Sequence, residues 1–173
     1  MECKGPDWNG PDWIGLDWIG LERNEIDWIR KKWKKKLILK GILDSEDAII
    51  ATKTGADAII VSNHGGRQLD GAPSSIKVLP EIVDAVGRKI EIHIDGGIRS
   101  GQDVVKALCL GAKGTYIGRA FLYGLGALGK TGVSKSLDII KNELDKTMAF
   151  CGRRNVEDLD KTNLYIEKPL NNY

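Results

Sequence analysis

Four short apolar runs follow one another after Lys36, and each has the length and composition of a buried β-strand. The runs are Leu37–Leu39, Ala58–Val61, Ile90–Ile94 and Gly114–Ile117. Segments with the start and stop signals of helices lie between them, at Asp44–Thr54, Pro80–Val86 and Ser100–Leu110, each directly before a glycine. Because strands and helices alternate, the pattern predicts an α/β fold with a parallel sheet and right-handed crossovers.

A fourth helix is predicted by an apolar stripe that ends before Gly152, a residue type common at helix C-termini. The stripe consists of Val133, Leu137, Ile140, Leu144, Met148 and Cys151. In the helix before it, Ser100 and Asp103 have the spacing of a capping box, with Asp in place of Glu. The order is therefore β-α-β-α-β-α-β-α, or about four βα units.

The first 36 residues have a different pattern, in which a unit of the form (Pro/Leu)-Asp-Trp-x-Gly repeats around Trp8, Trp13 and Trp18. A spacing of five fits neither a helix nor a strand, and Gly and Pro interrupt both. We therefore expect residues 1 to about 25 to be irregular or turn-rich, either as the product of tandem duplication or as an aromatic stacking platform. The basic run Arg30–Lys36 is either a solvated face or a contact for anionic lipid or nucleic acid.

These patterns divide the chain into an irregular, Trp/Gly-rich and basic segment, residues 1–36, and an α/β domain, residues 37–173. A hydrophobic share of 42% and a charged share of 29% are those of an ordinary globular chain, and 173 residues suit one domain. The net charge of +2 gives no bulk electrostatic argument for nucleic acid.

Cysteine usage and the absence of long apolar runs bear on the compartment. Cys3, Cys109 and Cys151 are odd in number and far apart, so we expect neither a disulfide framework nor a metal site. We expect Cys109 and Cys151 to pack as small hydrophobic residues. No apolar run approaches the ~18 residues of a membrane span, and the N-terminus lacks the apolar core of a signal peptide. The expected location is the cytoplasm.

Residues that suit catalysis or ligand binding follow the predicted strands at their C-terminal ends. Lys40 follows the first strand, His64 and Arg67 the second, Asp95 and Arg99 the third, and Gly118 and Arg119 the fourth. This distribution is typical of the catalytic face of a TIM barrel. A full barrel has about 250 residues and eight strands, so four strands amount to half of one.

Four ordered motifs resemble the FMN-dependent α-hydroxy-acid dehydrogenases and oxidases, among them glycolate oxidase and flavin-linked L-lactate dehydrogenase. The motifs are LKGI at Leu39–Ile42, SNHGGRQLDGAPSS at Ser62–Ser75, DGGIRSG at Asp95–Gly101 and GRAFLYGL at Gly118–Leu125. The resemblance covers about residues 26 to 162 and matches the C-terminal half of that family's (β/α)8 barrel. It implies the FMN-dependent oxidation of an L-2-hydroxy acid to a 2-oxo acid.

The resemblance also implies roles for individual residues. His64 would take the proton of the substrate C2 hydroxyl, and Arg67 would bind the substrate carboxylate. Lys40 would lie near flavin N1 and the C2 carbonyl, with Ser62 as a further flavin contact. The FMN ribityl chain and phosphate would be bound by Asp95, Gly97, Arg99, Gly118 and Arg119. We expect His93, which shares strand parity with Asp95, to be a hydrogen-bonded core residue.

The family's first four strands supply further site residues, including the aspartate that pairs with the catalytic histidine, and none of these is located in the sequence. The sheet edges near Leu37 and Gly114 are then expected to be unpaired. A second copy could complete an eight-stranded barrel, as could a separate N-terminal half. Three classes of function stay open: an enzyme completed by a partner, a half-barrel that binds FMN or phosphate without turnover, and a truncated, non-catalytic fragment.

Overall fold

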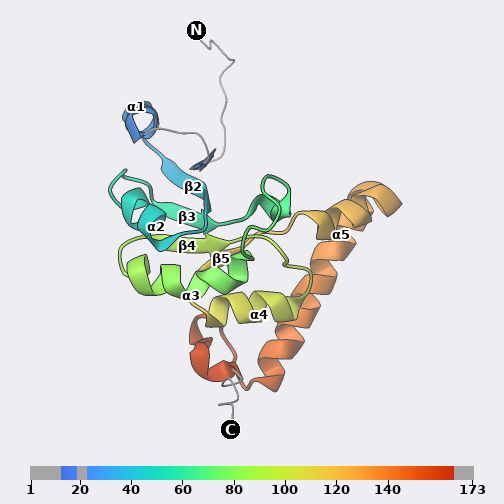
Figure 1. The fold of residues 1–173 in the computed structure, drawn as a ribbon. Coiled ribbons are helices and arrows are strands. Elements are labelled where there is room, and N and C mark those ends of the chain that lie inside the picture. Colours follow the sequence, from blue (N-terminus) through green and yellow to red (C-terminus); the bar gives the residue numbers. More distant parts are fainter. Residues whose placement is uncertain (1–12, 19–22, 166–173) are drawn as a thin grey trace.

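The structure, a computed structural model, describes residues 13–18 and 23–165, in which strands and helices alternate (Figure 1). The strands are β1 (Trp13–Asp17), β2 (Lys36–Ile42), β3 (Ala58–Val61), β4 (Glu91–Ile94) and β5 (Gly114–Thr115). The helices are α1 (Arg23–Lys32), α2 (Ser45–Ala51), α3 (Ser75–Val86), α4 (Gly101–Cys109) and α5 (Arg119–Phe150). Short 3-10 turns lie between β3 and α3, at His64–Gly66, and after α5, at Val156–Asp158 and Lys161–Asn163.

The strands form one sheet in the order β1-β2-β3-β4-β5, and every neighbouring pair is parallel. The parallel sheet and the sequence of four βα units after Lys36 are confirmed. Asp17 lies opposite Lys40 in β2, and Lys40 lies opposite Ile60 in β3. Since all strands run the same way, their C-terminal ends meet at one edge of the sheet.

The expectation of an irregular chain up to about residue 25 is wrong for Trp13–Asp17, which form β1, and for the start of α1. Residues 1–12 and 19–22, with Trp8, lie outside the described residues. The backbone pairing of β1 with β2 outweighs the low preference of Gly15 for strands. β1 also covers the sheet edge near Leu37, which was expected to be unpaired. Ile26 of α1 is fully buried in the core that holds β2 and β3, so the structure joins residues on both sides of the predicted boundary at Lys36.

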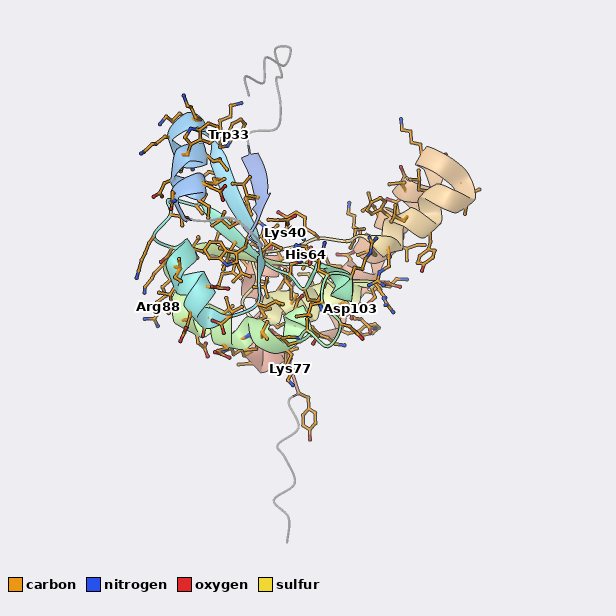
Figure 2. All side chains as sticks on the ribbon, turned by 45° about the horizontal axis from the view of Figure 1, so that its top comes forward. Trp33, Lys40, His64, Lys77, Arg88 and Asp103 are labelled. Atoms are coloured by element: carbon orange, nitrogen blue, oxygen red, sulfur yellow. The ribbon has the colours of Figure 1, made fainter. Side chains whose placement is uncertain are left out.

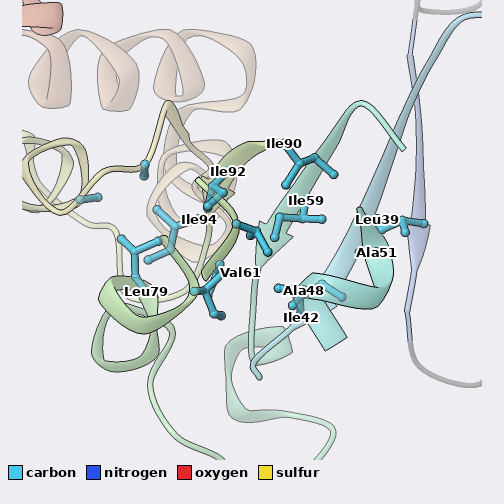
Figure 3. Close-up of a cluster of buried hydrophobic side chains, with 14 of the residues drawn as sticks. Leu39, Ile42, Ala48, Ala51, Ile59, Val61, Leu79, Ile90, Ile92 and Ile94 are labelled. Atoms are coloured by element: carbon cyan, nitrogen blue, oxygen red, sulfur yellow. The ribbon is translucent and has the colours of Figure 1, made fainter. Parts of the chain in front are cut away.

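One face of the sheet packs against helices and forms the main core (Figure 3). Alternate residues of the strands point into it, among them Ile59 and Val61 of β3 and Ile92 and Ile94 of β4. Helices α2, α3 and α4 contribute Ala48, Ala51, Leu79, Ile82, Val86, Val104 and Ala107. The opposite face carries a smaller cluster of Ile38, Ala58 and Ile60, with Tyr116 packed against it.

Helix boundaries follow the predicted signals only in part. The capping box of Ser100 and Asp103 is present at the start of α4, and the chain leaves the α5 region at Gly152 with φ +67°. Helix α3 begins at Ser75, so the start predicted at Pro80 is wrong; Pro80 lies inside the helix. Helix α5 begins at Arg119 and turns back on itself at Leu128 and Gly129, a change of direction that an apolar stripe does not reveal.

Cys109 is 2% exposed and packs against Val105 and Met148, as expected for a small hydrophobic residue. Burial raises the pKa of the Cys109 thiol, which keeps it protonated near neutral pH. Cys151 is partly exposed, and neither of these two cysteines is in a disulfide. Across the described ranges, no helix combines the length and the apolar character that crossing a bilayer requires.

Asp57, just before β3, ties α1 and β2 to the sheet. Its carboxylate accepts hydrogen bonds from the Leu37 backbone N–H at 2.9 Å, from Lys36 Nζ at 3.0 Å and from Arg30 Nη1 at 3.2 Å. Burial by itself raises the pKa of Asp57, but these hydrogen bonds and charges outweigh it and hold the pKa below 3.8.

We expect the substitution Asp57→Asn to reduce stability most at neutral pH. A lowered folded pKa contributes stability that is fully present above the unfolded value of 3.8 and is lost as the pH falls through the folded pKa. Urea unfolding at pH 7 and pH 2.5 measures this, and the difference between wild type and variant should shrink at the lower pH. Asp138→Asn, at an exposed position of α5, is the control. A difference that is equal at both pH values would contradict this account.

Candidate active site

A cavity of about 720 Å³ opens at the C-terminal edge of the sheet. Its lining includes every predicted site residue except one: Lys40, His64, Arg67, Asp95, Gly97, Arg99, Gly118 and Arg119. The exception, Ser62, is fully buried and contacts two of the lining residues, Lys40 and His64. The structure therefore brings together side chains that are up to 79 positions apart in the chain, since Lys40 and Arg119 line the same space.

Lys40 is the central charge of this edge. Its Nζ lies 3.2 Å from Ser62 Oγ, 3.4 Å from Asp95 Oδ2 and 3.9 Å from Asp17 Oδ1. These partners come from β1 and from the ends of β3 and β4, so one ammonium group contacts three strand ends. The Lys40 side chain is 29% exposed, and Figure 2 shows it beside His64 in the middle of the molecule.

His64 pairs with Asp17, an aspartate that was not predicted as a site residue. His64 Nε2 lies 3.2 Å from Asp17 Oδ1, and the His64 side chain is 13% exposed. A carboxylate only accepts hydrogen bonds, so this ring nitrogen carries the proton and donates it. The conclusion that no carboxylate partner for the histidine is present was therefore wrong, and the signal was an acidic residue at the end of the run Ile14–Leu16.

The His64 backbone has φ +54°, a left-handed conformation that is uncommon for a residue with a side chain. Neighbouring polar groups stabilise it. The His64 N–H donates to Ser62 Oγ at 3.1 Å, the Gly65 N–H donates to Asn63 Oδ1 at 3.0 Å, and the Asn63 N–H donates to Ser75 Oγ at 3.2 Å. The loop after β3 is thus bound to its own side chains and to the start of α3.

Gly41, beside Lys40, lets the imidazole approach β2. The register between β2 and β3 shifts between Lys40 and Ile42, and Gly41 has φ +98°. A Cβ at this position would lie 2.7 Å from His64 Cε1, too close for any side chain. The glycine after Lys40 is therefore required both by the backbone conformation and by the position of His64.

The other half of the cavity has the groups that bind an anion and a polyol. The arginines at positions 67, 99 and 119 line it, and a Cβ on Gly97 or Gly118 would meet no atom within 4 Å, so their backbone is accessible to a ligand. Asp95 Oδ1 is buried and has no hydrogen-bond partner in the part of the chain that the structure describes. A buried carboxylate oxygen needs a donor, and a hydroxyl of the FMN ribityl chain is a donor of this kind.

His93 does not face the cavity. Its Nδ1 lies 2.8 Å from Tyr116 Oη, and its Nε2 lies 2.7 Å from Glu91 Oε1. The expectation of a hydrogen-bonded core histidine is therefore confirmed for the hydrogen bonds, but His93 is only partly buried and belongs to none of the core clusters. Within the described ranges, no group of three or more His, Cys, Asp or Glu side chains could hold a metal ion.

Comparison with known proteins shows the family of the chain. The profile of the FMN-dependent dehydrogenase family matches residues 17–166. An L-lactate dehydrogenase of Caulobacter sp. (strain K31) is 54% identical over 140 residues, which cover 81% of this chain and 37% of the relative. The 2-hydroxyacid oxidase 1 of Mus musculus is 49% identical over 147 residues, which cover 85% of this chain and 40% of the relative.

Among solved structures, one described as the monotopic membrane protein (S)-mandelate dehydrogenase superposes with a TM-score of 0.82 at 44% identity. The match covers 85% of this chain and 39% of that protein. A mandelate oxidase with 3,3-difluoro-2-hydroxy-3-phenylpropionic acid superposes with a TM-score of 0.79 and is 43% covered. The chain therefore spans about two fifths of the length of the relatives that it matches.

We expect Gly41→Ala to disturb both the sheet and the imidazole. The new methyl group clashes with the His64 ring, and alanine is unfavourable at the φ of +98° that this position has. The free energy of unfolding should therefore fall by about 2 kcal/mol. Urea unfolding measures the loss, and the NMR shifts of the His64 ring protons report its displacement. Gly126→Ala is the matched control, because a Cβ at that helical position meets no atom within 4 Å. Equal stability and an unmoved ring in Gly41→Ala would show that the glycine is not required.

Proposed function

Because this chain belongs to the FMN-dependent dehydrogenase family, we propose that it binds FMN in the strand-end cavity and takes part in oxidising a small L-2-hydroxy acid to the 2-oxo acid. The proposal is carried by one observation. A histidine paired with a carboxylate shares a cavity with an ammonium group and three arginines. These are the groups that proton removal, charge compensation and anion binding require.

His64 acts as the general base in this proposal. With one ring nitrogen donating to Asp17, the other nitrogen accepts the proton of the substrate C2 hydroxyl. Asp17 keeps the ring in the required orientation and tautomer, and it stabilises the imidazolium that forms. As the O–H and C2–H bonds break, the C2 carbonyl forms. FMN, when bound, accepts the C2 hydrogen together with its electron pair.

Arg67 and Lys40 handle the negative charges of the reaction. The planar guanidinium of Arg67 binds the substrate carboxylate through two parallel hydrogen bonds and orients C2. Two carboxylates and Ser62 hold the ammonium group of Lys40 in place, where it would compensate negative charge on a bound flavin. In this proposal Ser62 acts on the flavin indirectly, through its hydrogen bond with Lys40 Nζ.

The remaining predicted residues bind the cofactor. Arg99 and Arg119 bind the phosphate together with the accessible backbone at Gly97 and Gly118. Asp95 contributes twice: Oδ2 binds Lys40, and the unpartnered Oδ1 accepts a ribityl hydroxyl. This division of the Asp95 oxygens is the observation that best supports FMN as the cofactor of this chain.

We further infer that the sheet is part of an eight-stranded barrel. The relatives are matched over only 37–40% of their length, and the sheet has five strands within the described residues. An eight-stranded barrel needs three strands more than these five, whereas two copies of the chain would supply ten. The count therefore favours a complementary segment of three βα units. A second copy would fit only if each copy contributed four strands. Binding of FMN without turnover is the alternative for the chain by itself.

Flavin retention tests the proposal. The purified chain is incubated with FMN, freed of excess flavin and examined by absorbance, and L-lactate or glycolate is then added without oxygen. Retained flavin that bleaches with either acid supports the full proposal. Retained flavin that does not bleach supports cofactor binding and shows that turnover requires a complement. If no flavin is retained at saturating FMN, the cavity is not a cofactor site in this chain.

We expect Arg119→Gln to weaken FMN binding about tenfold and to leave riboflavin binding unchanged, since a charged hydrogen bond to phosphate contributes about 1.5 kcal/mol. Fluorescence titration with the two flavins measures this, because riboflavin lacks only the phosphate. Arg154→Gln, at an exposed position that does not line the cavity, is the control. Equal losses for both flavins would place Arg119 away from the phosphate.

A further inference from the structure

β5 leads into two of the proposed phosphate-binding residues, Gly118 and Arg119, but has little backbone pairing. It consists of Gly114 and Thr115, and the adjoining backbone adds hydrogen bonds from the Lys113 N–H to Ile92 O at 2.7 Å and from the Tyr116 N–H to Ile94 O at 2.9 Å. Two and three residues after Tyr116 come Gly118 and Arg119. A strand of this length, at the edge of the sheet, holds its position weakly through the backbone alone.

A side-chain cluster on the other face from the helices reinforces this pairing. The His93 ring of β4 lies between Glu91 Oε1, at 2.7 Å, and Tyr116 Oη, at 2.8 Å. The His93 and Tyr116 ring centroids are 5.5 Å apart, and the His93 side chain is 15% exposed. The Tyr116 ring also packs against Ile38, Ala58 and Ile60, so it is fixed on two sides.

The hydrogen bonds of this cluster persist in both protonation states of the imidazole. Glu91 only accepts, so His93 Nε2–H is the donor, and in the neutral ring Nδ1 accepts from the Tyr116 hydroxyl. If the ring is protonated, Nδ1–H donates to the Tyr116 oxygen instead. Burial and the Glu91 charge raise the pKa of Tyr116, so its hydroxyl stays protonated. The connection between β4 and β5 is therefore kept over the physiological pH range.

We propose that Glu91, His93 and Tyr116 form a latch that positions Gly118 and Arg119 against Gly97 and Arg99, and that this latch sets the phosphate affinity of the cavity. The two arginines follow different strands, so their separation depends on how β5 lies along β4. Tyr116 itself lines the cavity. His93 and Glu91 act through it and are positioning residues. The inference rests on the proposed function in one respect: it takes the cavity as a phosphate site.

The variants Tyr116→Phe, His93→Gln and the double variant test the latch, with Tyr165→Phe as the matched control. Tyr165 is 92% exposed and does not line the cavity, so its substitution removes the same hydroxyl away from the latch and the anion site. Hydrogen exchange of the Lys113 and Tyr116 amides reports the pairing of β5 and needs no ligand. The dissociation constants of FMN and inorganic phosphate report the anion site.

We expect each single variant to speed exchange at these two amides and to weaken phosphate and FMN binding about three- to tenfold, the equivalent of one neutral hydrogen bond. The double variant should lose no more than His93→Gln, because that variant already removes the imidazole through which Glu91 and Tyr116 are connected. Tyr165→Phe should change neither property. A loss of thermal stability with unchanged anion affinity would reduce the cluster to packing and overturn the inference.

The two proposals fail separately. If wild type binds neither FMN nor phosphate, the proposed function fails, and with it the effect of the latch on affinity. Faster exchange in the variants would still establish that the cluster fixes β5. Wild-type exchange rates in Tyr116→Phe would overturn the latch even if the cavity binds FMN.

Discussion

The contact of the Lys40 ammonium with Asp17, Ser62 and Asp95 holds the functional edge of this protein together. Two carboxylates close to one another repel unless a cation lies between them, and Lys40 of β2 supplies that cation to Asp17 of β1 and to Asp95 after β4. With this charge in place, Asp17 can also pair with His64, and Asp95 can keep one oxygen for a ligand. The proposed base, the proposed charge compensation and the proposed polyol contact therefore depend on a single side chain.

The parallel register of the sheet places these groups. Asp17 and Lys40 are direct neighbours across β1 and β2, and Ser62 and Asp95 follow β3 and β4 at the same edge. The bulge at Gly41 turns the chain so that the His64 ring can lie against β2. Helices pack on one face only, which leaves the cluster of Ile38, Ala58 and Ile60 on the face that a barrel would enclose.

The elements that depend on residues close together in the sequence could be predicted from the local pattern of apolar and polar positions. The apolar runs predicted β2 to β4 within two or three residues, the capping box predicted α4, and residues after the strands predicted the cavity lining. β1 and Asp17 were missed because Gly15 and the repeat argue against a strand locally, whereas pairing with β2 is a non-local interaction. The reversal of α5 depends on two glycines, Gly124 and Gly132, that let its halves touch, and spacing alone does not reveal this contact.

Whether these strand ends form one flavin site can be tested with a crystal structure of the chain grown with saturating FMN. We expect the phosphate within hydrogen-bond distance of Arg99 and Arg119, and a ribityl hydroxyl on Asp95 Oδ1. We also expect the Asp17–His64 pair and the Lys40 contacts to be retained. Flavin bound elsewhere on the molecule, or an Asp95 Oδ1 that faces no ligand in the bound state, would contradict this expectation.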